Sequence, residues 1–178
     1  MTLTRARVRV EGIEQGVGFR PFVHALAGRL GLAGLVGNDG PTHMGLYDIA
    51  YMLAVPNMTV TAPKDGGEML ALLRLGVERG EGPFSLRYPR DAVPSAVPPL
   101  NEIGPIEYGS WEVLRRGGGL AILAVGTMVL PALEAAQRLE AEGLEATVVN
   151  CRFLKPVDER TLAWVAEHHD AIVTVEEG

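Results

Sequence analysis

Two polar side chains, Thr42 and His43, directly follow the turn signal Asn38-Asp39-Gly40. The apolar positions that come next have helical spacing: Leu46, Ile49, Ala50 and Leu53. A loop that brings a hydroxyl and an imidazole to a helix start favours an anion site, because free N–H groups there attract anions. A capped turn without a ligand explains the same residues, so both interpretations stay open.

A second loop, nearer the N-terminus, could also hold an anion. Gly16 and Gly18 lie in the segment between a strand predicted over residues 5–11 and a helix predicted over 21–32, and Arg20 ends that segment. Backbone N–H groups and a guanidinium can there converge on one phosphate. A tight structural turn is the simpler explanation of the glycines.

Composition limits the classes of protein to consider. With 178 residues, a net charge of −6 and 47% hydrophobic residues, we expect a soluble globular protein with one good core or two small ones. There is no apolar run of about 18 residues and no apolar signal core, so we expect a cytoplasmic protein without a membrane partner. The acidic balance argues against broad nucleic-acid binding. Cys151 is the single cysteine, which excludes an intrachain disulfide, and its apolar surroundings predict a buried thiol.

The order of predicted elements is typical of an α/β protein. Asp65 and Glu68 predict a capping box at the start of a helix between strands at 58–62 and 84–88, which implies a parallel crossover. The Pro-rich residues 91–106 have the composition of a linker. The elements predicted after it are strands at 111–114, 120–126, 147–153 and 171–175 and helices at 129–142 and 156–168. We therefore expect two parallel-sheet segments.

The first forty residues resemble a known domain. Residues 15–23 (QGVGFRPFV), 30–34 (LGLAG) and 38–40 (NDG) are similar to the acylphosphatase domain of hydrogenase-maturation carbamoyltransferases. The resemblance implies a partial acylphosphatase-like β-loop-α segment over residues 1–40, in which Arg20 binds an acyl phosphate and Asn38 positions the attacking water. Glu14 departs from the pattern, because a carboxylate beside a phosphate site would repel the ligand.

A longer resemblance follows and overlaps the first across residues 33–40. Residues 39–48 (DGPTHMGLYD), 62–65 (APKD), 87–90 (RYPR) and 150–158 (NCRFLKPVD) resemble the 1-deoxy-D-xylulose-5-phosphate synthase family of the transketolase superfamily. It implies the second half of a pyrimidine-binding domain at 41–92, a linker at 93–106 and part of a transketolase C-terminal domain at 107–178. The chain thus resembles a fragment of such an enzyme, fused to the acylphosphatase-like segment.

The family resemblance implies a thiamine-diphosphate-dependent transferase that condenses pyruvate with glyceraldehyde 3-phosphate, for isoprenoid precursor and thiamine biosynthesis. His43 and Arg87 would contact the donor-derived intermediate and the acceptor phosphate, with Asp39 and Arg90 as weaker candidates. A surface ion pair with Asp91 is the alternative for either arginine. Two positions depart from the family pattern: Leu32, where an arginine is usual, and Met44, where a polar residue is common.

Thiamine diphosphate and magnesium are the cofactors that the resemblance implies. The family's Gly-Asp-Gly motif does not occur in this sequence, and the cofactor-activating glutamate should lie upstream of residue 33, so we expect this chain alone to bind neither cofactor and to be inactive. The implied partners are a phosphorylated small molecule and a second copy of the chain, through exposed sheet edges or apolar faces. Two alternatives stay open: an acylphosphate hydrolase that uses Arg20 and Asn38, and a non-catalytic α/β scaffold.

Overall fold

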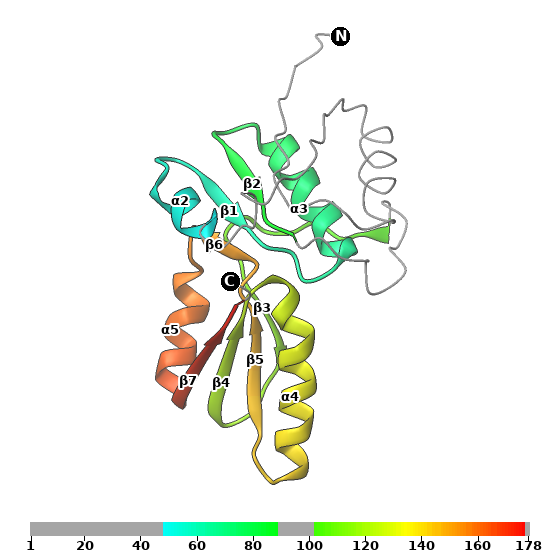
Figure 1. The fold of residues 1–178 in the computed structure, drawn as a ribbon, viewed down its shortest axis with the longest axis vertical. Coiled ribbons are helices and arrows are strands. Elements are labelled where there is room, and N and C mark those ends of the chain that lie inside the picture. Colours follow the sequence, from blue (N-terminus) through cyan, green and yellow to red (C-terminus); the bar gives the residue numbers. More distant parts are fainter. Residues whose placement is uncertain (1–47, 89–101, 177–178) are drawn as a thin grey trace, which may run out of the picture.

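The computed structural model describes residues 48–88 and 102–176. They form two lobes, each built on one sheet (Figure 1). The first lobe holds the sheet β2-β1-β6 with helices α2 and α3, and the second holds the sheet β3-β5-β4-β7 with α4 and α5. The elements are α2 (Asp48–Ala54), β1 (Thr59–Thr61), α3 (Gly66–Arg79), β2 (Phe84–Leu86), β3 (Glu112–Arg115), β4 (Gly119–Ala124), the 3-10 turn η2 (Gly126–Met128), α4 (Val129–Ala141), β5 (Ala146–Asn150), β6 (Phe153–Lys155), α5 (Glu159–His168) and β7 (His169–Val175). The predicted α/β class is confirmed.

The first lobe contains the predicted crossover β1-α3-β2, and β1 and β2 run parallel. Asp65 caps α3, because its Oδ1 accepts the Glu68 N–H at 2.7 Å. The helix ends at Gly80, whose φ of +61° lies in the left-handed region that glycine adopts without strain. Only half of the predicted capping box forms: the Glu68 carboxylate accepts the N–H of Lys64 instead of that of Asp65.

The second lobe buries both faces of the central strands β4 and β5 of its sheet. Side chains of a strand alternate between the two faces, so Ile122 and Ala124 of β4 pack with α4, while Ala121 and Leu123 pack with Val165 of α5. Figure 1 shows the two helices flanking this sheet. Except for the strand predicted over residues 147–153, the strand and helix positions predicted in this lobe are confirmed within a few residues.

Two strands run antiparallel to their neighbours, where the sequence predicted parallel sheets. In the second lobe β3 pairs antiparallel with β5, and in the first lobe β6 pairs antiparallel with β1. The strand predicted over residues 147–153 is also wrong as a single element. It divides into β5 and β6 because Cys151 N–H still bonds to Ala124 of the second lobe, whereas the Arg152 carbonyl accepts the N–H of Ala62 in the first.

Asp158 begins α5, as predicted, by accepting the Thr161 N–H at 2.9 Å. Burial would raise the pKa of Asp158, but hydrogen bonds from Thr161 and from the Trp111 N–H outweigh it, and the pKa is lowered. Pro156 precedes the helix instead of lying in its first turn.

Burial raises the pKa of the Cys151 thiol to about 12, and the negative charge of Asp158 raises it further. The predicted buried thiol is confirmed and is a poor nucleophile near neutral pH.

Candidate functional site

Arg87 is the one predicted site residue that falls within the described residues. It follows β2 directly, at the edge where the carboxyl ends of the parallel strands β1 and β2 lie together. Its backbone N–H donates to the Thr61 carbonyl at 2.7 Å, which fixes the chain at this edge. The other candidates lie outside the described residues: Arg20, Asn38, Asp39, His43 and Arg90.

The Arg87 guanidinium is held by a carboxylate 39 positions away in the sequence. Its Nε donates to both oxygens of Asp48, at 3.1 and 3.3 Å, and both side chains are mostly shielded from solvent. Asp48 is the first residue of α2, so the start of that helix orients the guanidinium. An oriented guanidinium at a strand end is suited to bind phosphate through charge-assisted hydrogen bonds.

Five polar side chains from the two lobes meet beside the start of α3, and we call them the interlobe cluster: Lys64, Glu68, Glu112, Asn150 and Arg152. Lys64 Nζ donates to Glu68 at 3.3 Å and to Glu112 at 2.9 Å. Asn150 Nδ2 donates to the same two carboxylates, at 2.8 and 3.4 Å. Arg152 Nη1 lies 3.5 Å from Glu68 Oε1. Glu68 and Asn150 are buried, so the contacts of Glu68 form out of water, whereas the Glu112 side chain is 38% exposed.

The charges of the cluster stabilise one another. Burial would lower the pKa of Lys64, but the carboxylates of Glu68 and Glu112 outweigh it and the pKa is raised. Burial would likewise raise the pKa of Glu112, but its hydrogen bond from Lys64 outweighs it and the pKa is lowered. Both side chains therefore stay charged across neutral pH. Glu112 depends on Lys64 of the other lobe, whereas Lys64 is stabilised first by Glu68 of its own lobe and then by Glu112.

Sequence patterns did not reveal the cluster, because its cross-lobe contacts join residues 48 to 84 positions apart. The signal that could have pointed to it is polarity inside apolar runs. Glu68 precedes the buried run Met69–Leu73, and Asn150 and Arg152 flank the buried Cys151. Buried charges almost always have partners.

The described residues do not fit a resident magnesium ion. Within residues 48–88 and 102–176, no group of three histidine, cysteine, aspartate or glutamate side chains could hold a metal. Glu68 and Glu112 already bind Lys64, which occupies the position a cation would take.

Within residues 48–88 and 102–176, no helix is long and apolar enough to cross a bilayer.

Three family profiles match the sequence. Residues 28–95 match "Transketolase, pyrimidine binding domain", residues 109–178 match "Transketolase, C-terminal domain", and residues 6–45 match "Acylphosphatase". The first two profiles span both lobes, while the third lies wholly outside the described residues. The fold and the matched segments define a transketolase-like α/β protein.

Among curated proteins the chain is homologous to part of 1-deoxy-D-xylulose-5-phosphate synthase. It is 49% identical over 148 residues to the enzyme of Rippkaea orientalis. The aligned residues cover 82% of this chain and 23% of the relative. The Aquifex aeolicus enzyme is 49% identical over 145 residues, again 82% of this chain and 23% of the relative. The chain therefore spans about a quarter of the length of these relatives. The resemblance to a thiamine-diphosphate-dependent family is supported.

Two solved structures share the fold. A split-gene transketolase, described as an inactive beta4 tetramer, is 40% identical with a TM-score of 0.70, over 76% of this chain and 44% of the other. A transketolase variant from Pichia stipitis is 26% identical with a TM-score of 0.62, over 79% of this chain and 21% of the other.

Proposed function

We propose that this chain supplies the acceptor-phosphate site of a thiamine-diphosphate-dependent transferase of the 1-deoxy-D-xylulose-5-phosphate synthase type. The observation that carries the proposal is the Arg87 guanidinium, which Asp48 orients at the carboxyl edge of β1 and β2. Arg87 binds the phosphate of glyceraldehyde 3-phosphate. His43 contacts the intermediate derived from pyruvate, and Asp39 and Arg90 assist with lesser roles.

In this proposal, other parts of such an enzyme bind the cofactor. Thiamine diphosphate would supply the carbanion chemistry when bound. We expect this chain alone to hold neither thiamine diphosphate nor magnesium, because the carboxylates of Glu68 and Glu112 are engaged with Lys64 and the Gly-Asp-Gly motif is absent from the sequence. The contribution of the chain is to bind and orient the phosphorylated acceptor.

We further propose that residues 1–40 are a partial acylphosphatase-like segment fused to the transketolase-like part. The acylphosphatase and pyrimidine-domain profiles overlap at residues 28–45. The fusion therefore lies within this overlap, in the stretch that both families share.

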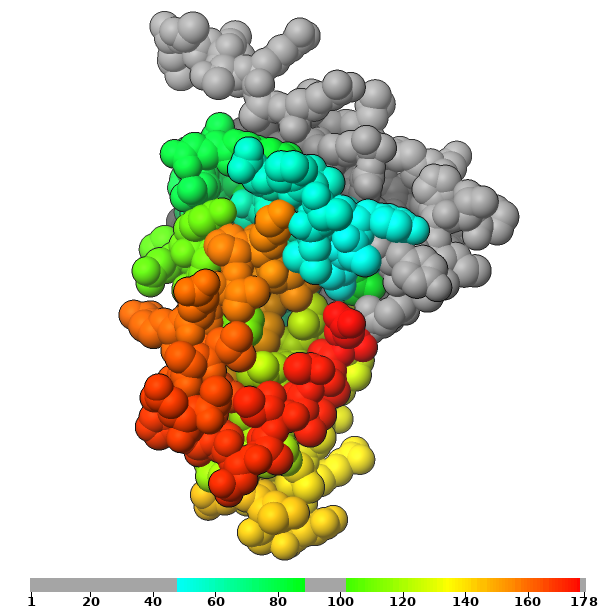
Figure 2. Space-filling model, turned by 90° about the vertical axis from the view of Figure 1, so that its left-hand side faces the viewer, coloured from blue at the N-terminus to red at the C-terminus, as the bar shows by residue number. Residues whose placement is uncertain are grey.

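A second copy of the chain is the proposed protein partner, and β7 is the contact. β7 is an edge strand of the described sheet, and Ile172 and Val173 on it are 42% and 46% exposed. Figure 2 shows β7, in red, as part of the molecular surface. An exposed apolar edge strand pairs readily with another strand. We expect sedimentation velocity to show concentration-dependent dimers that Val173→Lys abolishes, whereas a monomer at every concentration would contradict this contact.

The proposed phosphate site is tested in a chimera in which residues 33–178 replace the aligned segment of the Aquifex aeolicus relative. We expect the chimera to be active and Arg87→Gln to raise the KM for glyceraldehyde 3-phosphate at least about tenfold, since a hydrogen bond to a charged group contributes roughly 1.5–3 kcal/mol. The KM for pyruvate should change little. Arg79→Gln is the matched control, because Arg79 pairs with Glu81 on the surface of the same lobe.

Equal effects of the two substitutions on the KM for glyceraldehyde 3-phosphate would contradict the phosphate site. The 178-residue chain itself should show no synthase turnover. If it instead hydrolyses an acyl phosphate, and Arg20→Ala abolishes that activity, the hydrolase alternative describes the chain better.

A further inference from the structure

The carboxyl edge of the second sheet is covered by the first lobe. In open parallel sheets this edge is the usual place for a ligand. Here β4 and β5 point their carboxyl ends at the first lobe (Figure 1). Ala62 N–H donates to the Arg152 carbonyl at 3.0 Å, and a β-carbon at Gly126 would lie 3.5 Å from that of Ala62. Packed backbone thus occupies the position where a ligand would bind.

The covering contact is charged and largely out of water. Glu68 of the first lobe accepts hydrogen bonds from Asn150, the last residue of β5, and from Arg152, which lies two positions further on. Lys64 of the first lobe donates to Glu112 of β3. Each of these pairs joins one lobe to the other. Separating the lobes would therefore leave charged side chains without the partners they have in the folded chain.

Two flanking contacts hold the same strand end in place. Arg152 is fixed on its own lobe, because its Nε and Nη2 donate to the carbonyl and hydroxyl of Ser110, each at 2.8 Å. Lys155 Nζ donates to the carbonyls of Leu53 and Val55, at 2.9 and 2.8 Å, at the C-terminal end of α2. A cation is favourable at the C-terminal end of a helix. The segment from Asn150 to Lys155 is therefore attached to both lobes along its length.

We propose that the interlobe cluster is a lock that makes the two lobes unfold as one cooperative unit. The carboxyl edge of the second sheet is then a docking face for the first lobe and not a ligand site. This inference concerns the stability of the chain and holds whether or not Arg87 binds phosphate.

The test compares two arginine substitutions in the 178-residue chain by differential scanning calorimetry. Arg152→Met removes the cationic partner of the buried Glu68 from the other lobe, together with the two hydrogen bonds to Ser110. We expect it to lower the Tm by roughly 10 °C or to split the single transition into two. Arg115→Met is the matched control, because Arg115 pairs with Glu140 at 3.0 Å within the second lobe and is similarly shielded. Its single transition should persist and shift by at most a few degrees.

Native-state hydrogen exchange on the unchanged chain keeps the inference testable if a variant fails to fold. The amides of β1 and β4 should exchange through one global opening, with equal free energies and equal denaturant dependence. Two separate openings, or equal effects of Arg152→Met and Arg115→Met on a single transition, would overturn the lock.

Discussion

Replacing Asn150 with aspartate should lower the free energy of unfolding at pH 7 by about 3 kcal/mol or more. Asn150 is fully buried, and its amide donates to two carboxylates, those of Glu68 and Glu112. The Asn150→Asp side chain keeps the shape but exchanges the donor for a third negative charge. Its Oδ1 already lacks a hydrogen-bond partner in the described structure, and the nearby cations Lys64 and Arg152 are already engaged with Glu68 and Glu112.

The pH dependence of the Asn150→Asp variant distinguishes charge repulsion from poor packing. A carboxyl forced among carboxylates has a higher pKa folded than unfolded. Its cost is therefore absent below the unfolded pKa of about 4 and grows as the pH rises above it. Urea unfolding at pH 4 and pH 7 should show a larger difference from the unchanged chain at pH 7. An equal loss of unfolding free energy at pH 4 and at pH 7 would contradict the electrostatic explanation.

Asn57→Asp is the control for Asn150→Asp. Asn57 is exposed and has a φ of +58°, a conformation that aspartate also tolerates. The same chemical change at this surface position should alter the free energy of unfolding by no more than about 0.5 kcal/mol.

Elements set by local chemistry could be predicted from the sequence. Asp65 and Asp158 are short polar side chains ahead of periodic apolar runs, and both cap helices in the structure. The buried positions of β4 and the placement of α4 also follow from hydrophobic period alone. Such features depend on residues within a few positions of one another, which a sequence pattern can record.

Features set by long-range pairing could not be predicted. Residues 147–153 read as one apolar strand, and only the contacts of Cys151 and Arg152 with different lobes divide it. The antiparallel direction of β3 and β6 likewise depends on which neighbour each strand meets. At the candidate site, the sequence indicated Arg87 through a family resemblance, but its partner Asp48 is 39 positions away and was not foreseen.

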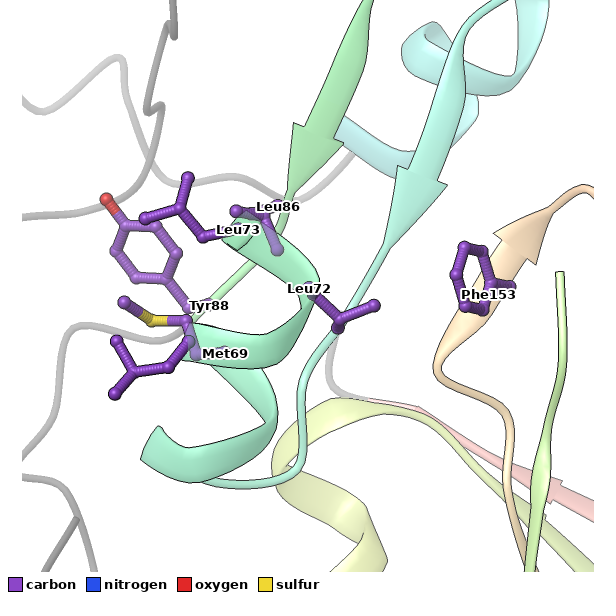
Figure 3. Packing of buried hydrophobic residues seen from close by; sticks show 7 residues of the cluster. Met69, Leu72, Leu73, Leu86, Tyr88 and Phe153 are labelled. Atoms are coloured by element: carbon purple, nitrogen blue, oxygen red, sulfur yellow. The ribbon is translucent and has the colours of Figure 1, made fainter. Parts of the chain in front are cut away.

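Phe153 lies in the chain segment that leaves the second lobe, yet it fills the core of the first. It is fully buried and packs edge-on against Tyr108, with ring centroids 5.6 Å apart. Figure 3 shows Leu72 extending from α3 toward the side on which Phe153 lies, and both belong to one buried cluster. The Phe153 carbonyl also accepts the indole N–H of Trp111 at 2.7 Å. Phe153 thus joins the two lobes through apolar packing, as the interlobe cluster joins them through charged side chains.

Phe153→Ala should reduce the free energy of unfolding by about 3–5 kcal/mol, since it removes a buried ring and leaves a cavity. Guanidinium unfolding followed by tryptophan fluorescence measures this, because Trp111 packs against the buried clusters of both lobes. Phe153→Leu retains most of the volume and should cost less than about 1.5 kcal/mol. Leu162→Ala, at a site 37% exposed on α5, should cost less than Phe153→Ala. A similar loss for Phe153→Ala and Leu162→Ala would show that β6 does not hold the first lobe together.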